Sequence, residues 1–92
     1  IYRYKSVVEI EIAGFHIIGG LLHAFISALM QPQTMKSKNL LLLIPKQFVI
    51  DTHPSKTYDS IQSIVDYIAG MTDLYALDLY RKITGINVPE LN

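Results

Sequence analysis

The sequence has no cysteine and no tryptophan, and it carries little charge. Without cysteine the chain can form no disulfide, no thiolate metal site and no cysteine nucleophile. Eight Lys+Arg balance eight Asp+Glu, so the formal net charge is zero and nothing favours a nucleic acid as the main partner. Charged residues make up 17% of the chain and hydrophobic residues 50%, a composition that excludes a disordered protein.

The length of 92 residues allows one domain at most. The chain opens at Ile1 without an initiator methionine, and we expect residues 1–92 to be a single helical segment of a larger protein. Residues 12–30 resemble a membrane span, since His16 and His23 are their only ionisable residues. Lysines on both sides and the lack of tryptophan argue against a span. A helix buried on most sides in a larger protein has the same pattern, so we expect no membrane association.

Apolar periodicity predicts an all-α fold with two long helices, over about 7–30 and 56–84, and a short helix between them. Ser6 and Glu9 form a capping-box pattern at the start of the first helix. The glycines at 14, 19 and 20 lower its helix propensity, which is tolerable where another helix approaches the backbone closely. The helix is expected to end before Pro32.

The short helix is predicted over 38–44, after Ser37 and before Pro45, and a loop is predicted over 46–56. The last long helix is expected to bend near Gly70 and to end at Gly85. Thr72 and Asp73 are residue types that can cap a fresh helix after the bend. No alternating strand pattern occurs in the sequence.

Three histidines make metal binding the first chemistry to consider. A helical metal site needs ligands three or four residues apart, whereas His16 and His23 are seven apart, about 10 Å along a helix axis. His53 precedes Pro54 in a predicted loop. We therefore expect no self-contained metal site, and we expect His16 and His23 to face neighbouring helices as hydrogen-bonded groups.

The polar side of the last long helix is the second candidate site. Asp59, Gln62, Asp66 and Asp73 follow one another at steps of three, four and seven, so they share one side of a continuous helix. Such a row can accept hydrogen bonds from a sugar hydroxyl or hold a cation-bound phosphate. An ordinary solvated face is the alternative, and it is the usual role of charges on a helix.

A more specific pattern occurs at residues 65–77, which read Val-Asp-Tyr-Ile-Ala-Gly-Met-Thr-Asp-Leu-Tyr-Ala-Leu. This 65–77 motif resembles the Asp-Tyr-Ile-Ala-Gly-Met-Thr-Asp-x-Tyr-Ala string near the C-terminus of bacterial deoxyguanosinetriphosphate triphosphohydrolase-like proteins. Residues 8–15, 19–22 and 85–89 are similar to further stretches of that family, in the same order. The resemblance covers roughly residues 2–89.

The resemblance implies a C-terminal part of an all-α phosphohydrolase with a His-Asp metal site. In such a cytoplasmic, homo-oligomeric parent enzyme, a deoxynucleoside triphosphate such as dGTP is hydrolysed to the deoxynucleoside and inorganic triphosphate. A divalent metal, Mg²⁺, Mn²⁺ or similar, activates the attacking water. The sequence contains no His-Asp dipeptide, so the resemblance implies no catalytic residue and no metal ligand here, and an inactive fragment.

The resemblance also implies that the start of the last long helix forms a wall of the nucleotide pocket. Tyr58 can stack on or hydrogen-bond a base or sugar, while Gln62 and Asp66 can read hydroxyl and ring-edge groups. Asp73 is expected to cap the segment after Gly70.

The alternative function is a non-catalytic helical domain that binds protein partners. The helix over 7–30 is apolar on nearly all sides, and this pattern predicts self-association.

Overall fold

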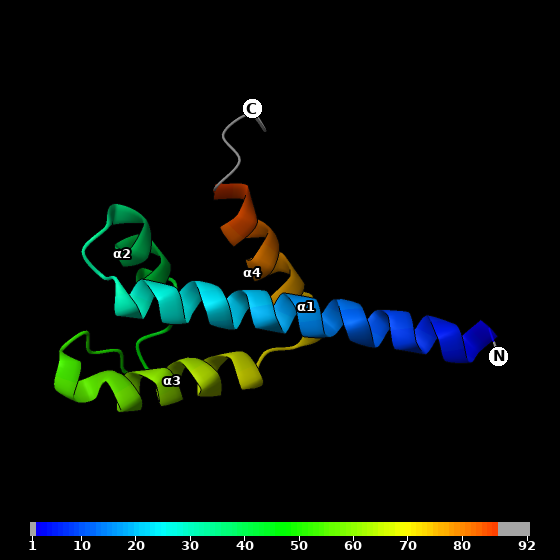
Figure 1. Ribbon diagram of the computed structural model, residues 1–92, viewed down its shortest axis with the longest axis horizontal. Helices are drawn as coiled ribbons and strands as arrows, with labels where there is room; N and C mark the ends of the chain where they lie inside the picture. The colour runs from blue at the N-terminus through cyan, green and yellow to red at the C-terminus, as the bar shows by residue number, and fades with distance from the viewer. Residues whose placement is uncertain (1, 87–92) are drawn as a thin grey trace.

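The described part of the chain is helical without strands, which confirms the predicted all-α class (Figure 1). The computed structural model describes the backbone of residues 2–86 and the side chains of residues 14–85. The elements follow in the order α1 (Tyr2–Met30), α2 (Met35–Leu42), the 3-10 turn η1 (Pro54–Lys56), α3 (Thr57–Ala69) and α4 (Asp73–Ile86). Helix α1 contacts the other three, with α3 along one side and α2 and α4 on the other.

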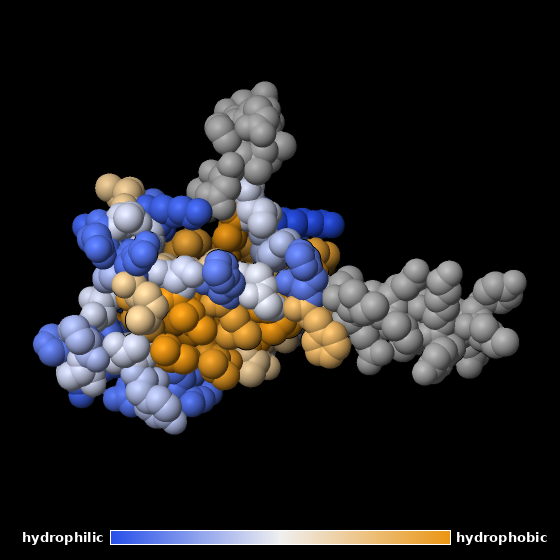
Figure 2. All heavy atoms as spheres, in the orientation of Figure 1, coloured by the Kyte–Doolittle hydropathy of each residue, from blue (hydrophilic) through white to orange (hydrophobic). Residues whose placement is uncertain are grey.

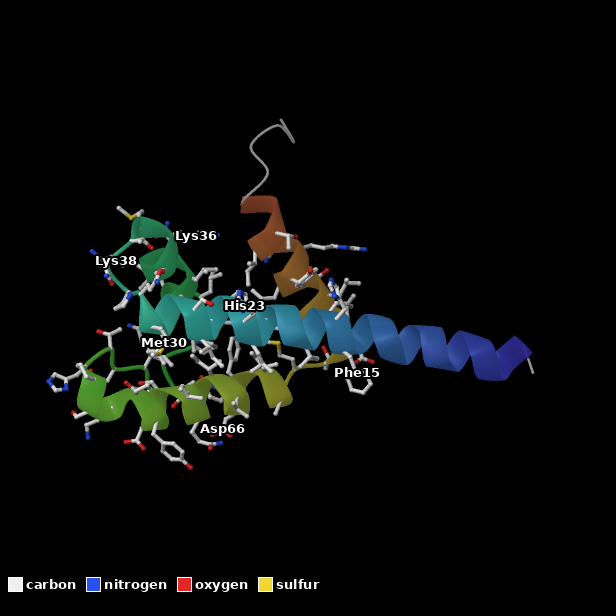
Figure 3. All side chains as sticks on the ribbon, in the orientation of Figure 1. Phe15, His23, Met30, Lys36, Lys38 and Asp66 are labelled. Atoms are coloured by element: carbon white, nitrogen blue, oxygen red, sulfur yellow. The ribbon has the colours of Figure 1, made fainter. Side chains whose placement is uncertain are left out.

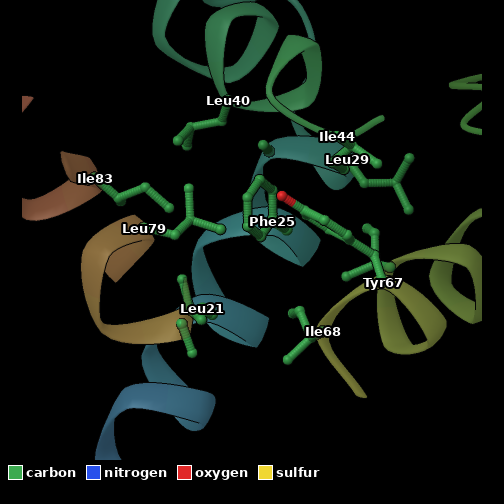
Figure 4. Close-up of a cluster of buried hydrophobic side chains, with 12 residues drawn as sticks. Leu21, Phe25, Leu29, Leu40, Ile44, Tyr67, Ile68, Leu79 and Ile83 are labelled. Carbon is green, nitrogen blue, oxygen red and sulfur yellow. The ribbon is translucent and has the colours of Figure 1, made fainter. Parts of the chain in front are cut away.

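The core forms where the three shorter helices meet the second half of α1. Leu21 and Phe25 of α1 and Ile64 of α3 are fully buried. Figure 4 shows the side chains that surround Phe25, which come from all four helices and from the segment after α2: Leu29, Leu40, Ile44, Tyr67, Ile68, Leu79 and Ile83. Burial of each large side chain is worth about 1.5–3 kcal/mol. Helix α1 is therefore held mainly through residues 21–29.

Helix α1 begins earlier than the sequence predicted. It is helical from Tyr2, so Ser6 and Glu9 lie inside the helix and the predicted capping box does not mark its start. Residues 2–5 contain neither proline nor glycine, so no helix-breaking residue prevents the helix from extending toward the N-terminus. Within the described residues, no helix combines the length and the apolar character that a membrane crossing requires.

The short helix is displaced from its predicted range of 38–44. Helix α2 starts at Met35 because Thr34, rather than Ser37, is its N-cap. The Thr34 Oγ1 atom accepts a hydrogen bond from the Ser37 amide at 3.1 Å. The helix ends at Leu42, two residues earlier than expected.

The helix predicted over 56–84 is two helices, α3 and α4, rather than one helix with a bend. Helix α3 ends with Gly70 as its C-cap. The Thr72 Oγ1 atom then accepts a hydrogen bond from the Tyr75 amide at 3.1 Å, so Thr72 caps α4 and Asp73 lies in its first turn. Helix α4 continues through Gly85 to Ile86, and no described glycine adopts the left-handed conformation of a typical C-cap.

The segment between α2 and α3 is packed on the core rather than free in solvent. Ile44 is buried, and Phe48 and Ile50 pack against the core. Ser60 of α3 is 1% exposed and binds the segment twice, because its Oγ atom accepts from the Asp51 amide at 2.8 Å and donates to the Asp51 carbonyl at 2.9 Å. The predicted loop also contains the short turn η1.

Candidate functional site

The three residues predicted to bind substrate lie on one exposed face of α3. Tyr58, Gln62 and Asp66 are four residues apart, about one helical turn each. All three side chains are exposed, and Tyr58 is 77% exposed. Figure 3 shows Asp66 on the side of α3 that points away from α1. We call these three residues the outer face of α3.

Gln62 and Asp66 are hydrogen-bonded to each other in the absence of a ligand. The Gln62 Nε2 atom donates a hydrogen bond to the Asp66 Oδ1 atom at 3.0 Å. A carboxylate has about four acceptor positions, so Asp66 can still accept hydrogen bonds from a ligand hydroxyl. The pairing therefore orients the carboxylate and leaves most of its accepting capacity available.

The predicted acidic row is shorter than expected. Asp59, Gln62 and Asp66 are exposed residues of α3, whereas Asp73 belongs to α4 on the far side of the helix break. The expectation that one helix face carries all four residues assumed a continuous helix and is wrong for Asp73. Asp73 instead lies in the first turn of α4, where the helix dipole favours a negative charge.

The 65–77 motif builds the joint between α3 and α4. Tyr67 of α3 is buried, and its hydroxyl lies 3.0 Å from the Tyr75 hydroxyl of α4 in a hydrogen bond across the joint. The Tyr67 ring also packs edge-on against Phe25 and at a tilt against Phe48. Gly70 and the Thr72 cap lie between the two tyrosines along the chain. The motif thus connects α3 and α4 through a side-chain hydrogen bond and supplies the cap of α4.

An open pocket of about 310 Å³ lies beside this joint. It is lined by residues of the motif and of the segment after α2: Pro45, Gln47, Phe48, Tyr67, Gly70, Met71, Thr72 and Tyr75. Burial, aided by the hydrogen bond with Tyr75, raises the pKa of Tyr67 above its ordinary range, so its hydroxyl stays neutral. Sequence reasoning missed this pocket, although two tyrosines eight residues apart around Gly70 were a signal for it.

The histidines have separate surroundings. His16 faces a neighbouring helix as predicted: its Nε2 atom is hydrogen-bonded to the Tyr80 hydroxyl of α4 at 3.3 Å, with the rings in edge contact. His23 is exposed on the same helix and makes no hydrogen bond within the described residues, so the expectation of a hydrogen-bonded group is wrong for His23. The described residues contain no group of three His, Asp or Glu side chains that can hold a metal ion. They therefore do not fit the divalent metal that the resemblance implies.

Comparison with known proteins relates the chain to phosphohydrolases. A family model described as the phosphohydrolase-associated domain matches residues 1–82. The deoxyguanosinetriphosphate triphosphohydrolase-like proteins of Synechocystis sp. and Listeria monocytogenes are each 37% identical to the chain, over 89 and 102 residues. The deoxyguanosinetriphosphate triphosphohydrolase of Yersinia enterocolitica is 28% identical over 112 residues. No solved structure matches the chain significantly.

The matches cover most of this chain and a small part of the relatives. They include 96%, 95% and 90% of the chain, but 20%, 22% and 22% of the Synechocystis, Listeria and Yersinia proteins. The chain thus spans about a fifth of the length of these curated relatives. The matches to the family model and to these relatives confirm the resemblance inferred from the 65–77 motif. Because the family model matches nearly the whole chain, this protein belongs to the family of phosphohydrolase-associated domains.

Proposed function

We propose that this chain is the non-catalytic C-terminal helical region of a cytoplasmic, metal-dependent deoxynucleoside triphosphohydrolase. The enzyme hydrolyses a deoxynucleoside triphosphate such as dGTP to the deoxynucleoside and inorganic triphosphate. Support comes from the names of the relatives and from the fifth of their length that the chain spans. In this proposal the divalent metal, Mg²⁺ or Mn²⁺, is held by another part of the enzyme, and the described residues contain no group of three His, Asp or Glu side chains that could hold it.

We place the outer face of α3 against the nucleotide. The observation that carries this assignment is the position of Asp66 within the 65–77 motif. The tyrosines and the threonine of the motif build the α3–α4 joint, and Asp73 lies in the first turn of α4. The Asp66 side chain takes no part in the joint and is hydrogen-bonded to Gln62 on the exposed side of α3. The fold therefore leaves this carboxylate available for a ligand.

Charge determines which end of the nucleotide meets this face. Asp59 and Asp66 are both exposed on α3, and carboxylates repel a triphosphate. The deoxyribose and base carry hydroxyl and amino donors that a carboxylate accepts, and the Tyr58 ring offers an aromatic surface for stacking. We therefore infer that the deoxynucleoside end lies along α3, while the triphosphate points toward the metal elsewhere in the enzyme.

Kinetics of full-length enzyme variants test the site. Asp66→Asn and Tyr58→Phe each remove one hydrogen-bonding function, so kcat/KM is expected to fall about 5- to 150-fold in each. The melting temperature should stay unchanged because both side chains are exposed. Asp78→Asn, an exposed carboxylate of α4, is the matched control and should keep full activity. If both outer-face variants keep full kcat/KM, the face is merely solvated.

A protein-interaction role is the second candidate, and the exposed apolar surface of α1 favours it. Phe15 is 75% exposed and Met30 is 60% exposed, with half-buried Ile18, Leu22 and Ile26 between them on the same side of the helix. We call these five residues the apolar band of α1. Figure 2 shows the apolar surface that extends over this side of α1 and α3. We propose that the band forms a contact between copies of the protein in a homo-oligomer.

A further inference from the structure

Helices α1, α2 and α4 enclose a cleft of about 440 Å³ on the side of α1 that faces away from α3. Its walls carry His23 and Ser27 from α1, Lys36 from α2, and Tyr80 and Thr84 from α4. Figure 3 shows His23 on α1 and Lys36 on α2. We call this hollow the three-helix cleft. It is separate from both the outer face of α3 and the pocket beside the α3–α4 joint.

The cleft has polar side chains on its walls and no aspartate or glutamate among the described lining residues. Ser27, Gln31 and His23 line it with a hydroxyl, an amide and an imidazole group. The hydroxyls of Thr34 and Thr84 already donate within the chain, to the Ser37 Oγ atom and the Tyr80 carbonyl. Lys36 is the one charged residue in this lining, so the charge of the wall is positive. The first turn of α2, capped by Thr34, belongs to the same wall, and its helix dipole adds to the positive potential.

The α4 wall of the cleft is held in place without a ligand. A Cβ atom on Gly20 would lie 2.5 Å from the Cε1 atom of Tyr80, so the absence of a side chain there lets the tyrosine ring lie directly on α1. The Tyr80 hydroxyl is hydrogen-bonded to His16 at 3.3 Å. A side chain fixed in this way loses little conformational entropy when a ligand binds.

We propose that the three-helix cleft binds a phosphate group, carried by a nucleotide or by an inorganic polyphosphate. Phosphate oxygens accept several hydrogen bonds at once, and the Lys36 ammonium group, together with the Ser27 hydroxyl and the Gln31 amide, matches that need. A volume of about 440 Å³ lies within the usual range of small-molecule sites and exceeds what a simple ion requires. The lack of carboxylates disfavours a cationic ligand. This inference does not rest on the proposed function, because it uses no residue of the outer face.

Calorimetric titration of the intact 92-residue chain with sodium tripolyphosphate tests the proposal. Lys36→Gln removes the cation from the cleft and is expected to weaken binding about 10- to 150-fold. Lys38→Gln removes the same charge from the same helix outside the cleft lining, so it should change binding less than twofold. Both lysines are exposed, and neither change should disturb the fold.

Titration with dGTP, compared with the titration with tripolyphosphate, identifies the source of the phosphate. Tighter binding of dGTP than of tripolyphosphate, with the same dependence on Lys36, assigns the cleft to a nucleotide. Equal or tighter binding of tripolyphosphate, again dependent on Lys36, assigns it to an inorganic polyphosphate. The proposal is wrong if the unmodified chain binds neither phosphate compound at millimolar concentration, or if Lys36→Gln and Lys38→Gln weaken binding equally.

Discussion

Gly19 and Gly20 are adjacent in α1, yet they have different surroundings. A Cβ atom on Gly19 would have no atom within 4 Å, whereas one on Gly20 would meet the Tyr80 ring. The sequence predicted that the glycines of this helix allow another helix to approach closely. That interpretation is confirmed for Gly20 alone, because the side of α1 on which α4 lies is decided by packing and not by the glycines themselves.

The two glycines should respond to alanine in opposite directions. Gly19→Ala is expected to raise the free energy of unfolding by about 1 kcal/mol, since alanine is the better helix former and the position is open. Gly20→Ala should lower it, because the Tyr80 ring must shift and its bond to His16 is lost. Urea denaturation of both variants measures the effect. An equal rise in both would show that Tyr80 does not rest on Gly20.

The hydroxyl groups that cap the helices explain why the helix boundaries were predicted only approximately. Ser37 and Asp73 are good capping residues by type, but Thr34 and Thr72 cap α2 and α4 instead. The choice depends on which oxygen reaches a free amide three residues later, and neighbouring candidates are nearly equivalent in sequence. Residue type therefore predicted that caps exist near these points and could not select between them.

Helix α1 has three sides with different roles. One side is buried in the core through Leu21, Phe25, Ala28 and Leu29. A second side lines the three-helix cleft with His23 and Ser27, and the third is the apolar band. The sequence predicted a helix that is apolar nearly all round, and periodicity alone could not show which apolar side would stay partly exposed.

The apolar band should make the chain self-associate. Exposed apolar patches drive association, so sedimentation is expected to show dimers or larger species at about tens of micromolar. Replacing Phe15 and Met30 by glutamate places charge on the band at exposed positions and should restore the monomer. Val49→Glu, which changes a 70% exposed residue outside the band, is the control and should leave association intact. A monomeric unmodified chain would exclude the band as an oligomer contact.

For the molecule as a whole, the sequence predicted features that lie within one helix better than features that depend on packing between distant parts of the chain. The all-α class and the shared side of Asp59, Gln62 and Asp66 follow from helical periodicity, and the 65–77 motif indicated the family. The pocket beside the α3–α4 joint and the three-helix cleft were not predicted. Both depend on the way in which α2 and α4 pack on α1, with contacts such as that between His16 and Tyr80, which lie 64 residues apart.

The same contrast applies to the candidate site. Spacing placed Asp59, Gln62 and Asp66 on one side of a helix, and all three are exposed residues of α3, whereas Tyr58 was proposed from the resemblance and not from spacing. The pairing of Tyr67 with Tyr75 depends on a break between two helices, and a single bent helix would have placed them differently. Prediction therefore succeeded within one element and failed where two elements meet.

The most direct test of the account is the release of inorganic triphosphate from dGTP in the presence of Mn²⁺ or Mg²⁺, measured for the full-length enzyme and for residues 1–92 alone. We predict that the full-length enzyme releases triphosphate and deoxyguanosine in equal amounts. The chain alone should release nothing above background, because its described residues form no metal-binding cluster. Triphosphate release by the isolated chain, or its absence from the full-length enzyme, would contradict the proposed division of roles.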